Sequence, residues 1–165
     1  MVAGVPKGGP GGRRVERGRG RQLFLGTHEH SLDDKGRIIL PSRFRPKLEE
    51  GAVLVLWLEE CVTVFPRSEF DRIAEKIKAL PEGNKARRLL AHVIFGNAYE
   101  AVPDRQGRLT IPPRLRQLAG LNREVVAVGL ADRVEIWDRE RWEKSIKGGI
   151  ETREEAAEKL AELGF

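Results

Sequence analysis

Two short segments of the sequence place turn-forming residues and arginines in the same order. Residues 33–45 and 104–116 both read Asp-x-x-Gly-Arg, then a short apolar stretch, then Pro-x-Arg-apolar-Arg. An aspartate at the first position caps its own turn, and the glycine supplies the positive φ that such a turn needs. Arginine presents a planar fork of donors that suits guanine or phosphate. The segments therefore predict two hairpin turns whose arginines could contact DNA.

Both segments are locally basic. Residues 33–47 hold five bases and two acids, and residues 104–116 hold four bases and one acid, so each has a net charge of +3. The candidate DNA-binding side chains are Lys35, Arg37, Arg43, Arg45, Arg105, Arg108, Arg114 and Arg116. The candidate turn-organising residues are Asp33, Gly36, Asp104 and Gly107. An alternative stays open, in which Arg37 and Arg108 only pair with the motif aspartates and the other bases are solvated surface.

The two segments belong to a longer internal repeat. The offset between them is 71 residues, and further on the strands at 53–57 and 62–65 match 125–129 and 134–137 at an offset of 72. Each unit reads as a β-hairpin, a short helix and a second β-hairpin. Four short strands are too few to be stable alone. We therefore expect the units, at 24–70 and 95–142, to close on each other.

Helices are expected after and between the strands. Ser42 is predicted to cap a short helix after the first motif. Apolar residues at helical spacing predict a helical linker over 71–94, with a capping box at Ser68 and Asp71. A helical tail is expected over 143–165.

The overall charge does not come from these units. The chain has 165 residues and a net charge of +5, and residues 1–22 alone hold six bases and one acid. We expect this Gly/Arg-rich extension to be disordered, and favour a solvated leader over a nucleic-acid-binding arm. No apolar run is long enough to span a membrane.

Little in the sequence suggests enzyme chemistry. His28 and His30 share one face of a strand but have no third ligand nearby, and Cys61, the single cysteine, is expected to be buried packing. The sequence contains no Gly-rich phosphate loop, nucleophile elbow or zinc motif. We expect no enzymatic activity, no cofactor and no bound metal.

Several motifs in order resemble the MraZ family of bacterial transcriptional regulators, which have two SpoVT-AbrB-like units. The matching stretches are residues 24–26, 31–37, 41–45, 61–66, 104–112, 115–121, 128–129 and 135–138. The resemblance implies an α+β fold, namely a tandem AbrB-like swapped-hairpin β-barrel with flanking helices. It also implies a homo-oligomer, probably ring-shaped. Because the family usually begins near Leu23, we expect translation to start there and residues 1–22 to be a gene-model error.

The resemblance further implies sequence-specific binding of double-stranded DNA. The sites would be direct repeats in the promoter of the division and cell-wall gene cluster, which includes the regulator's own gene. The turns Asp33/Arg37 and Asp104/Arg108 would face this DNA, in the cytoplasm at the nucleoid and away from any membrane. The alternative is an AbrB-type antitoxin or protein-binding module. Two units and a C-terminal helix argue against it, because an antitoxin usually has one unit and an extended toxin-binding tail.

Overall fold

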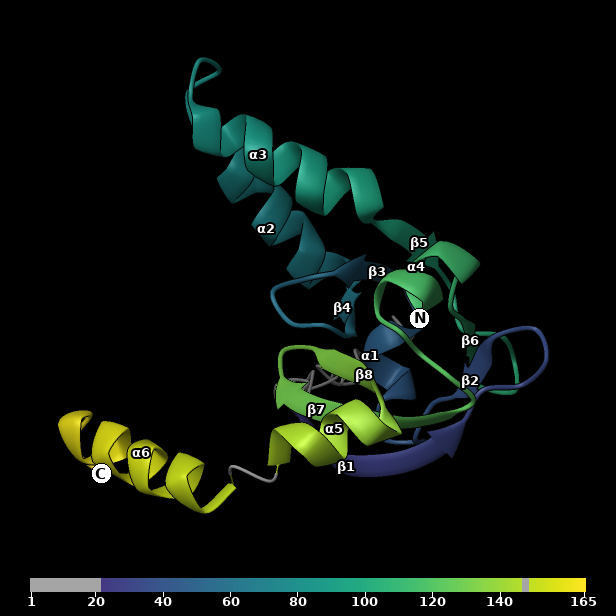
Figure 1. Ribbon diagram of the computed structural model, residues 1–165. Helices are drawn as coiled ribbons and strands as arrows, with labels where there is room; N and C mark the ends of the chain where they lie inside the picture. Colours follow the sequence, from purple (N-terminus) through teal and green to yellow (C-terminus); the bar gives the residue numbers. More distant parts are fainter. Residues whose placement is uncertain (1–21, 147–148) are drawn as a thin grey trace, which may run out of the picture.

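The computed structural model describes residues 22–146 and 149–165. Strands and helices follow one another in the same order in two repeats (Figure 1). The first repeat contains β1 (Phe24–Ser31), β2 (Arg37–Ile39), α1 (Arg45–Leu48), β3 (Ala52–Leu56) and β4 (Val62–Pro66). The connection contains α2 (Arg67–Lys78), α3 (Lys85–Ile94) and the 3-10 turn η1 (Phe95–Asn97). The second repeat contains β5 (Tyr99–Ala101), β6 (Arg108–Thr110), α4 (Pro113–Leu118), β7 (Glu124–Ala131), β8 (Val134–Asp138) and α5 (Arg139–Ile146). The last helix is α6 (Gly149–Glu162).

These elements confirm the predicted α+β class. The Gly/Arg-rich extension, residues 1–22, was expected to be disordered. Apart from Gln22, these residues lie outside the described ones. Within the described ranges, no helix has the length and apolar character that crossing a membrane requires.

The strands of the two repeats are interleaved in one antiparallel sheet. Its order is β1-β7-β8-β4-β3-β5, and β2 and β6 form a separate two-stranded ribbon. Only the β3–β4 and β7–β8 ladders join strands of the same repeat, whereas the other four ladders join one repeat to the other. Strand pairing among the described residues does not close this sheet into the implied barrel, because β1 and β5 are its two edges.

Strand register shows an internal two-fold relationship between the repeats. In the β4–β8 ladder, Thr63 lies opposite Glu135, which is its own counterpart at the offset of 72. In the β2–β6 ladder, Ile38 lies opposite Leu109, its counterpart at the offset of 71. A strand can pair with its own counterpart in this way only if a dyad passes between the two residues. The chain is therefore arranged like a dimer of its two repeats.

The predicted match between the third strands was wrong by one residue. Since Leu56 pairs with Val62, and Gly129 pairs with Val134, the counterpart of residues 125–129 is 52–56 and not 53–57. The connection from α4 to β7 is two residues longer than the one from α1 to β3, as the element bounds show. The apolar run at 52–57 is continuous, so its pattern could not reveal the shift.

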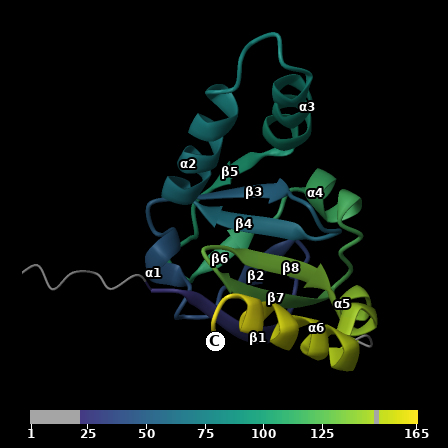
Figure 2. The same ribbon diagram turned by 90° about the vertical axis from the view of Figure 1, so that its left-hand side faces the viewer.

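The sheet separates two apolar clusters. One face packs against the β2–β6 ribbon and α1 and α4, around fully buried side chains such as Phe24, Phe44 and Leu109. The rings of Phe24 and Phe44 meet edge to face, with centroids 5.2 Å apart. The other face contacts the α2–α3 hairpin through Phe65, Phe70 and neighbouring side chains. Figures 1 and 2 both show this hairpin extending away from the ribbon.

Both predicted caps were wrong, because each helix begins away from the capping residue. The helix α2 begins at Arg67 with Pro66 as its N-cap residue, and no side chain caps it. Asp71 instead accepts a hydrogen bond from Arg67 Nε at 3.2 Å. The helix α1 begins at Arg45 after a turn in which Phe44 N donates to Pro41 O at 2.9 Å, so Ser42 lies before the helix.

Candidate nucleic-acid interface

The first motif forms a tight turn around one carboxylate. Asp33 Oδ1 accepts hydrogen bonds from the backbone N–H groups of Lys35 and Arg37, each at 2.9 Å. Asp33 Oδ2 accepts a bond from Arg37 Nε at 2.6 Å. The backbone closes the turn, because Gly36 N donates to Asp33 O at 2.9 Å. One side chain thus fixes both the turn and the direction of an arginine.

The second motif has the same geometry. Asp104 Oδ1 accepts from the backbone N–H groups of Gln106 and Arg108 at 2.9 Å, and Oδ2 accepts from Arg108 Nε at 2.6 Å. In each turn the backbone N–H of the arginine is the main cause that holds the pKa of the aspartate below its usual value, with the guanidinium adding to it. Both carboxylates are therefore charged at neutral pH.

Each turn is covered by an arginine of the other repeat. Gly36 and Gly107 have φ of 72° and 76°, a conformation that favours glycine. A Cβ atom on Gly36 would lie 2.5 Å from Cζ of Arg116, and one on Gly107 would lie 2.5 Å from Cζ of Arg45. The glycines therefore provide both the turn and the space for a guanidinium.

These two covering arginines are half-buried and differ in their bonds. Arg45 Nε donates to Leu40 O at 3.1 Å. Arg116 Nε is buried without a hydrogen-bond partner among the described residues. Both side chains lie between the repeats rather than pointing freely into solvent.

The turns lie at opposite ends of the β2–β6 ribbon. Ile111 N donates to Gly36 O, and Leu40 N donates to Gly107 O, each at 2.9 Å. Leu40 lies four positions after Gly36, so at about 3.3 Å a position the two turns are about 13 Å apart. The ribbon thus carries both turns on one element.

The outward face of the ribbon carries four side chains. Ile38 and Leu109 point into the core and are fully buried. The residues on either side of them alternate outward, and they are Arg37, Ile39, Arg108 and Thr110. The sequence prediction included the two arginines but missed Ile39 and Thr110. Strict alternation around the buried Ile38 and Leu109 was the signal that could have found them.

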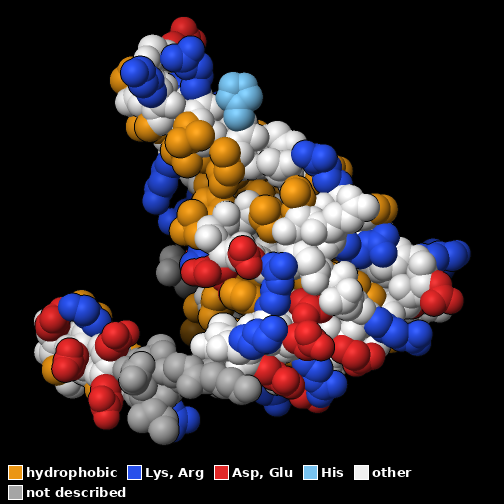
Figure 3. All heavy atoms as spheres, viewed as in Figure 1, with side chains coloured by type: hydrophobic (Ala, Val, Ile, Leu, Met, Phe, Trp, Pro, Cys, Tyr) orange, Lys and Arg blue, Asp and Glu red, His pale blue; other side chains and the backbone are white. Residues whose placement is uncertain are grey.

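The other predicted DNA-binding residues differ in exposure. The exposed ones are Lys35, Arg43, Arg105 and Arg114, and the half-buried ones are Arg37, Arg45, Arg108 and Arg116. In Figure 3, Lys and Arg side chains gather near the end of the molecule where β2 and β6 lie, with Asp and Glu side chains among them. Basic and acidic groups are thus mixed there. The position of each side chain therefore matters more for what this end can bind than its net charge does.

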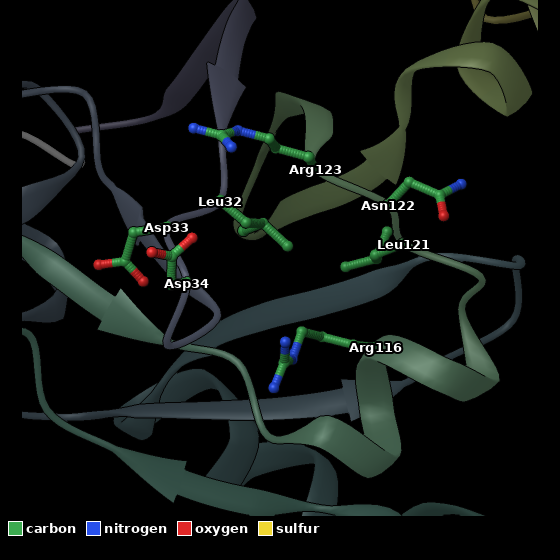
Figure 4. A pocket seen from close by; sticks show the side chains of 7 residues that line it. All are labelled: Leu32, Asp33, Asp34, Arg116, Leu121, Asn122 and Arg123. Carbon is green, nitrogen blue, oxygen red and sulfur yellow. The ribbon is translucent and has the colours of Figure 1, made fainter.

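A pocket of about 280 Å³ lies beside the first turn. Figure 4 shows its lining side chains, which are Leu32, Asp33, Asp34, Arg116, Leu121, Asn122 and Arg123. The longer α4–β7 connection forms one wall, and Asp138 Oδ1 holds it by accepting bonds from the backbone and the side chain of Asn122. Two aspartates offset the two arginines, so the pocket does not favour a ligand of one charge sign.

Interlocked repeats that share one ribbon define a protein with two related, mutually dependent units. Comparison with known proteins also finds two related units in the chain. The family model described as "MraZ protein, putative antitoxin-like" matches residues 23–93 and again residues 94–163. The chain belongs to the MraZ family, and the resemblance predicted from the motifs is confirmed.

Relatives from several bacteria match most of the chain, and each is named "Transcriptional regulator MraZ". The relative from Salinispora arenicola is 51% identical over 73% of this chain and 85% of its own length. The one from Parafrankia sp. is 49% identical over 84% of this chain and 96% of its own. The one from Clostridium tetani is 41% identical over 87% of this chain and all of its own.

Proposed function

We propose that this protein is a transcriptional regulator that binds double-stranded DNA sequence-specifically through the β2–β6 ribbon. The observation that carries the proposal is the pair of arginines, Arg37 and Arg108, held on the outward face of one ribbon by equivalent aspartates. The names of the relatives support a role in transcription. No enzymatic step is part of this proposal.

The arginines keep their recognition groups available while they are paired. Each bond to aspartate uses Nε, and within the described part of the chain no hydrogen bond engages either Nη atom of Arg37 or Arg108. A guanidinium fixed at Nε can still present its two Nη atoms to guanine O6 and N7 or to a phosphate. The sequence left open an alternative in which Arg37 and Arg108 only pair with the motif aspartates. In the proposed function the same pairing is kept, and it orients each arginine toward DNA.

The ribbon has dimensions that suit the major groove. This groove is about 12 Å wide and admits a two-stranded ribbon. The two turns, about 13 Å apart by strand rise, would lie near its two walls. There the exposed bases Lys35, Arg43, Arg105 and Arg114 would contact phosphates. Arg45 and Arg116 would act on DNA through the turns that they cover.

The wider assignments extend the same proposal. We infer that the sites are direct repeats in the promoter of the division and cell-wall gene cluster, including this protein's own gene. A ring-shaped homo-oligomer with swapped-hairpin barrels would place several ribbons on successive repeats. Each ribbon makes few contacts, so avidity would supply the affinity. Such a regulator would work in the cytoplasm at the nucleoid.

The test removes the aimed arginines and compares a matched loss of charge. We expect Arg37→Ala combined with Arg108→Ala to abolish specific binding in a gel-shift assay at fixed salt, while the oligomer stays intact. The control combines Arg72→Ala with Arg88→Ala, two exposed arginines on α2 and α3. The control removes the same charge and should keep specific binding. Unchanged affinity of the ribbon variant for its preferred sequence would refute the proposal.

A further inference from the structure

The two halves of the ribbon have the same framework but different exposed side chains. Aspartate, glycine and arginine recur at equivalent places in both turns. On the outward face, however, Ile39 has Thr110 as its counterpart. At the tip of the turn, Asp34 has Arg105 as its counterpart. The dyad therefore relates the two backbones and not the two recognition surfaces.

Ile39 is an unusual residue for its place. Its side chain is 53% exposed, although it lies on a short strand beside the aimed Arg108, which is its cross-strand neighbour. On the other half, Thr110 is the cross-strand neighbour of Arg37. One half of the face thus presents an arginine beside an apolar group, and the other presents an arginine beside a hydroxyl.

We propose that Ile39 and Thr110 determine sequence specificity, and that the DNA site of one chain is non-palindromic. Ile39 contacts the 5-methyl group of a thymine, while Thr110 faces a different base and hydrogen-bonds to its edge. The proposal rests on the function proposed above, because it assumes that the outward face of the ribbon enters the major groove.

The chemistry of the groove supports this assignment. The thymine methyl is the one apolar group among the donors and acceptors of the major-groove edges, so an exposed isoleucine has one favourable partner there. Threonine carries a methyl group and also a hydroxyl that can bond to either donors or acceptors. Ile39 and Thr110 lie at equivalent places of the backbone but differ chemically. We therefore expect the two halves of the ribbon to prefer different bases.

The turn tips differ in charge. Phosphate repels the carboxylate of Asp34 and attracts the guanidinium of Arg105, and both side chains are exposed. The two ends of the ribbon would therefore hold the two DNA backbones with unequal strength. Phosphates are alike at both walls of the groove, so the base contacts of Ile39 and Thr110 would set the orientation of the chain on the DNA.

The experiment begins with selection of bound sequences from a random DNA pool by the full chain. In the selected site, each thymine is then replaced in turn by deoxyuridine, which lacks only the methyl group. We expect one replacement to weaken binding of the unmodified protein about fourfold, the value of one buried methyl group. Ile39→Ser should remove this sensitivity while Arg37 and Arg108 still support binding.

A second selection uses residues that the ribbon already accepts. Ile39→Thr makes the two halves of the outward face alike, and Thr110→Ile does so with the other residue. We expect each variant to select a site whose two halves become more alike at the bases that these residues face. Both residues are exposed. Unchanged thermal unfolding and oligomer size would show that each variant keeps the fold.

Three results would overturn the inference. The first is equal binding to thymine and deoxyuridine at every position. The second is selection of the same non-palindromic site by Ile39→Thr as by the unmodified protein. The third is a change in oligomer size with Ile39→Thr at unchanged DNA preference, which would make Ile39 an interface residue between subunits. If the unmodified chain selects no sequence at all, the proposed function fails as well.

Discussion

A single aspartate in each repeat joins local folding to the proposed recognition of DNA. Asp33 and Asp104 each bind two backbone N–H groups with one oxygen and an arginine with the other. The order of the turn and the direction of the arginine therefore depend on the same carboxylate. The two copies agree in these distances, so the same motif has the same geometry in both repeats.

The glycines of the turns should tolerate no side chain. We expect Gly36→Ala to lower the free energy of unfolding by about 1–2 kcal/mol, the cost of a left-handed conformation for an L-residue. The added Cβ would also displace the guanidinium of Arg116. Chemical denaturation measures this change. The matched control is Gly83→Ala, at a glycine with no atom within 4 Å of the added carbon, and an equal loss there would contradict the argument.

The aspartates should make stability depend on acid pH. Their pKa values are lowered in the fold from the ordinary 3.8. A lowered pKa contributes stability that is complete above the unfolded value and is lost as the pH falls through the folded value. We expect the unmodified protein to lose stability below about pH 4 more steeply than Asp33→Asn combined with Asp104→Asn. Denaturation midpoints between pH 2 and 7, taken as roughly the range that covers these values, test this, and parallel curves would contradict it.

Cys61 should be chemically silent in the folded protein. Its side chain is fully buried, and burial is the main cause that raises the pKa of the thiol to about 12, with Glu135 adding to the effect. The thiolate is the reactive form, so at pH 8 a thiol reagent should modify the native protein far more slowly than the denatured one. Labelling followed by mass spectrometry measures both rates. Rapid native labelling would show that the β4 region opens readily.

At the scale of elements, the ribbon is held by its inward residues. Ile38 and Leu109 are both fully buried and lie opposite each other at the dyad. We expect Ile38→Ala and Leu109→Ala each to cost about 2–5 kcal/mol of unfolding free energy, because each leaves a cavity in a packed core. The costs in the double variant should not add, since the residues are neighbours. If the losses of unfolding free energy in the two single variants summed to the loss in the double variant, the two side chains would not interact, and the prediction would be wrong.

Ion pairs also repeat at this scale, and they join elements of different repeats. Arg67, at the start of α2, pairs with Glu100 of β5, and Arg139, at the start of α5, pairs with Glu29 of β1. Each arginine therefore links the helix directly after the last strand of one repeat to an edge strand of the other. Glu29, Arg67 and Glu100 are well exposed and Arg139 is half-buried, so these pairs align the elements more than they stabilise them.

Sequence patterns predicted most elements and missed those that depend on contact between the repeats. Periodicity and turn chemistry are local, so the strands around the Asp-x-x-Gly-Arg motifs were predictable. The register of β3 was not, because the run at 52–57 is apolar throughout and only pairing with β4 and β5 fixes it. The predicted caps failed for a related reason, since tertiary packing ends β4 at Pro66 and starts α2 directly afterwards.

The candidate site was predictable in composition and not in arrangement. The arginines were evident from the repeated motif. Nothing in the motif showed that Arg45 and Arg116 cover the turn of the opposite repeat. That exchange follows from the pairing of β2 with β6, which is a contact between residues about 70 positions apart. The roles proposed for Ile39 and Thr110 depend on the outward face of the ribbon, which the pairing of β2 with β6 defines.

At the scale of the whole molecule, neither repeat should fold alone. Four of the six ladders join the repeats, so a fragment of residues 22–94 would expose most of its strand edges. We expect fragments 22–94 and 95–165 each to be unfolded or aggregated, and to form a soluble complex with native circular dichroism when co-expressed. A monomeric fragment with cooperative unfolding would contradict this dependence.

The internal dyad also bears on how such a protein can change. In a dimer of identical short chains, every substitution appears on both sides of the axis, and the two halves must accept it together. Here both halves are encoded in one chain, so a substitution at Ile39 leaves Thr110 as it was. The shared framework preserves folding while each half of the surface varies independently. Under the proposed function, a chain that holds two such units can thus acquire a new DNA preference one base position at a time.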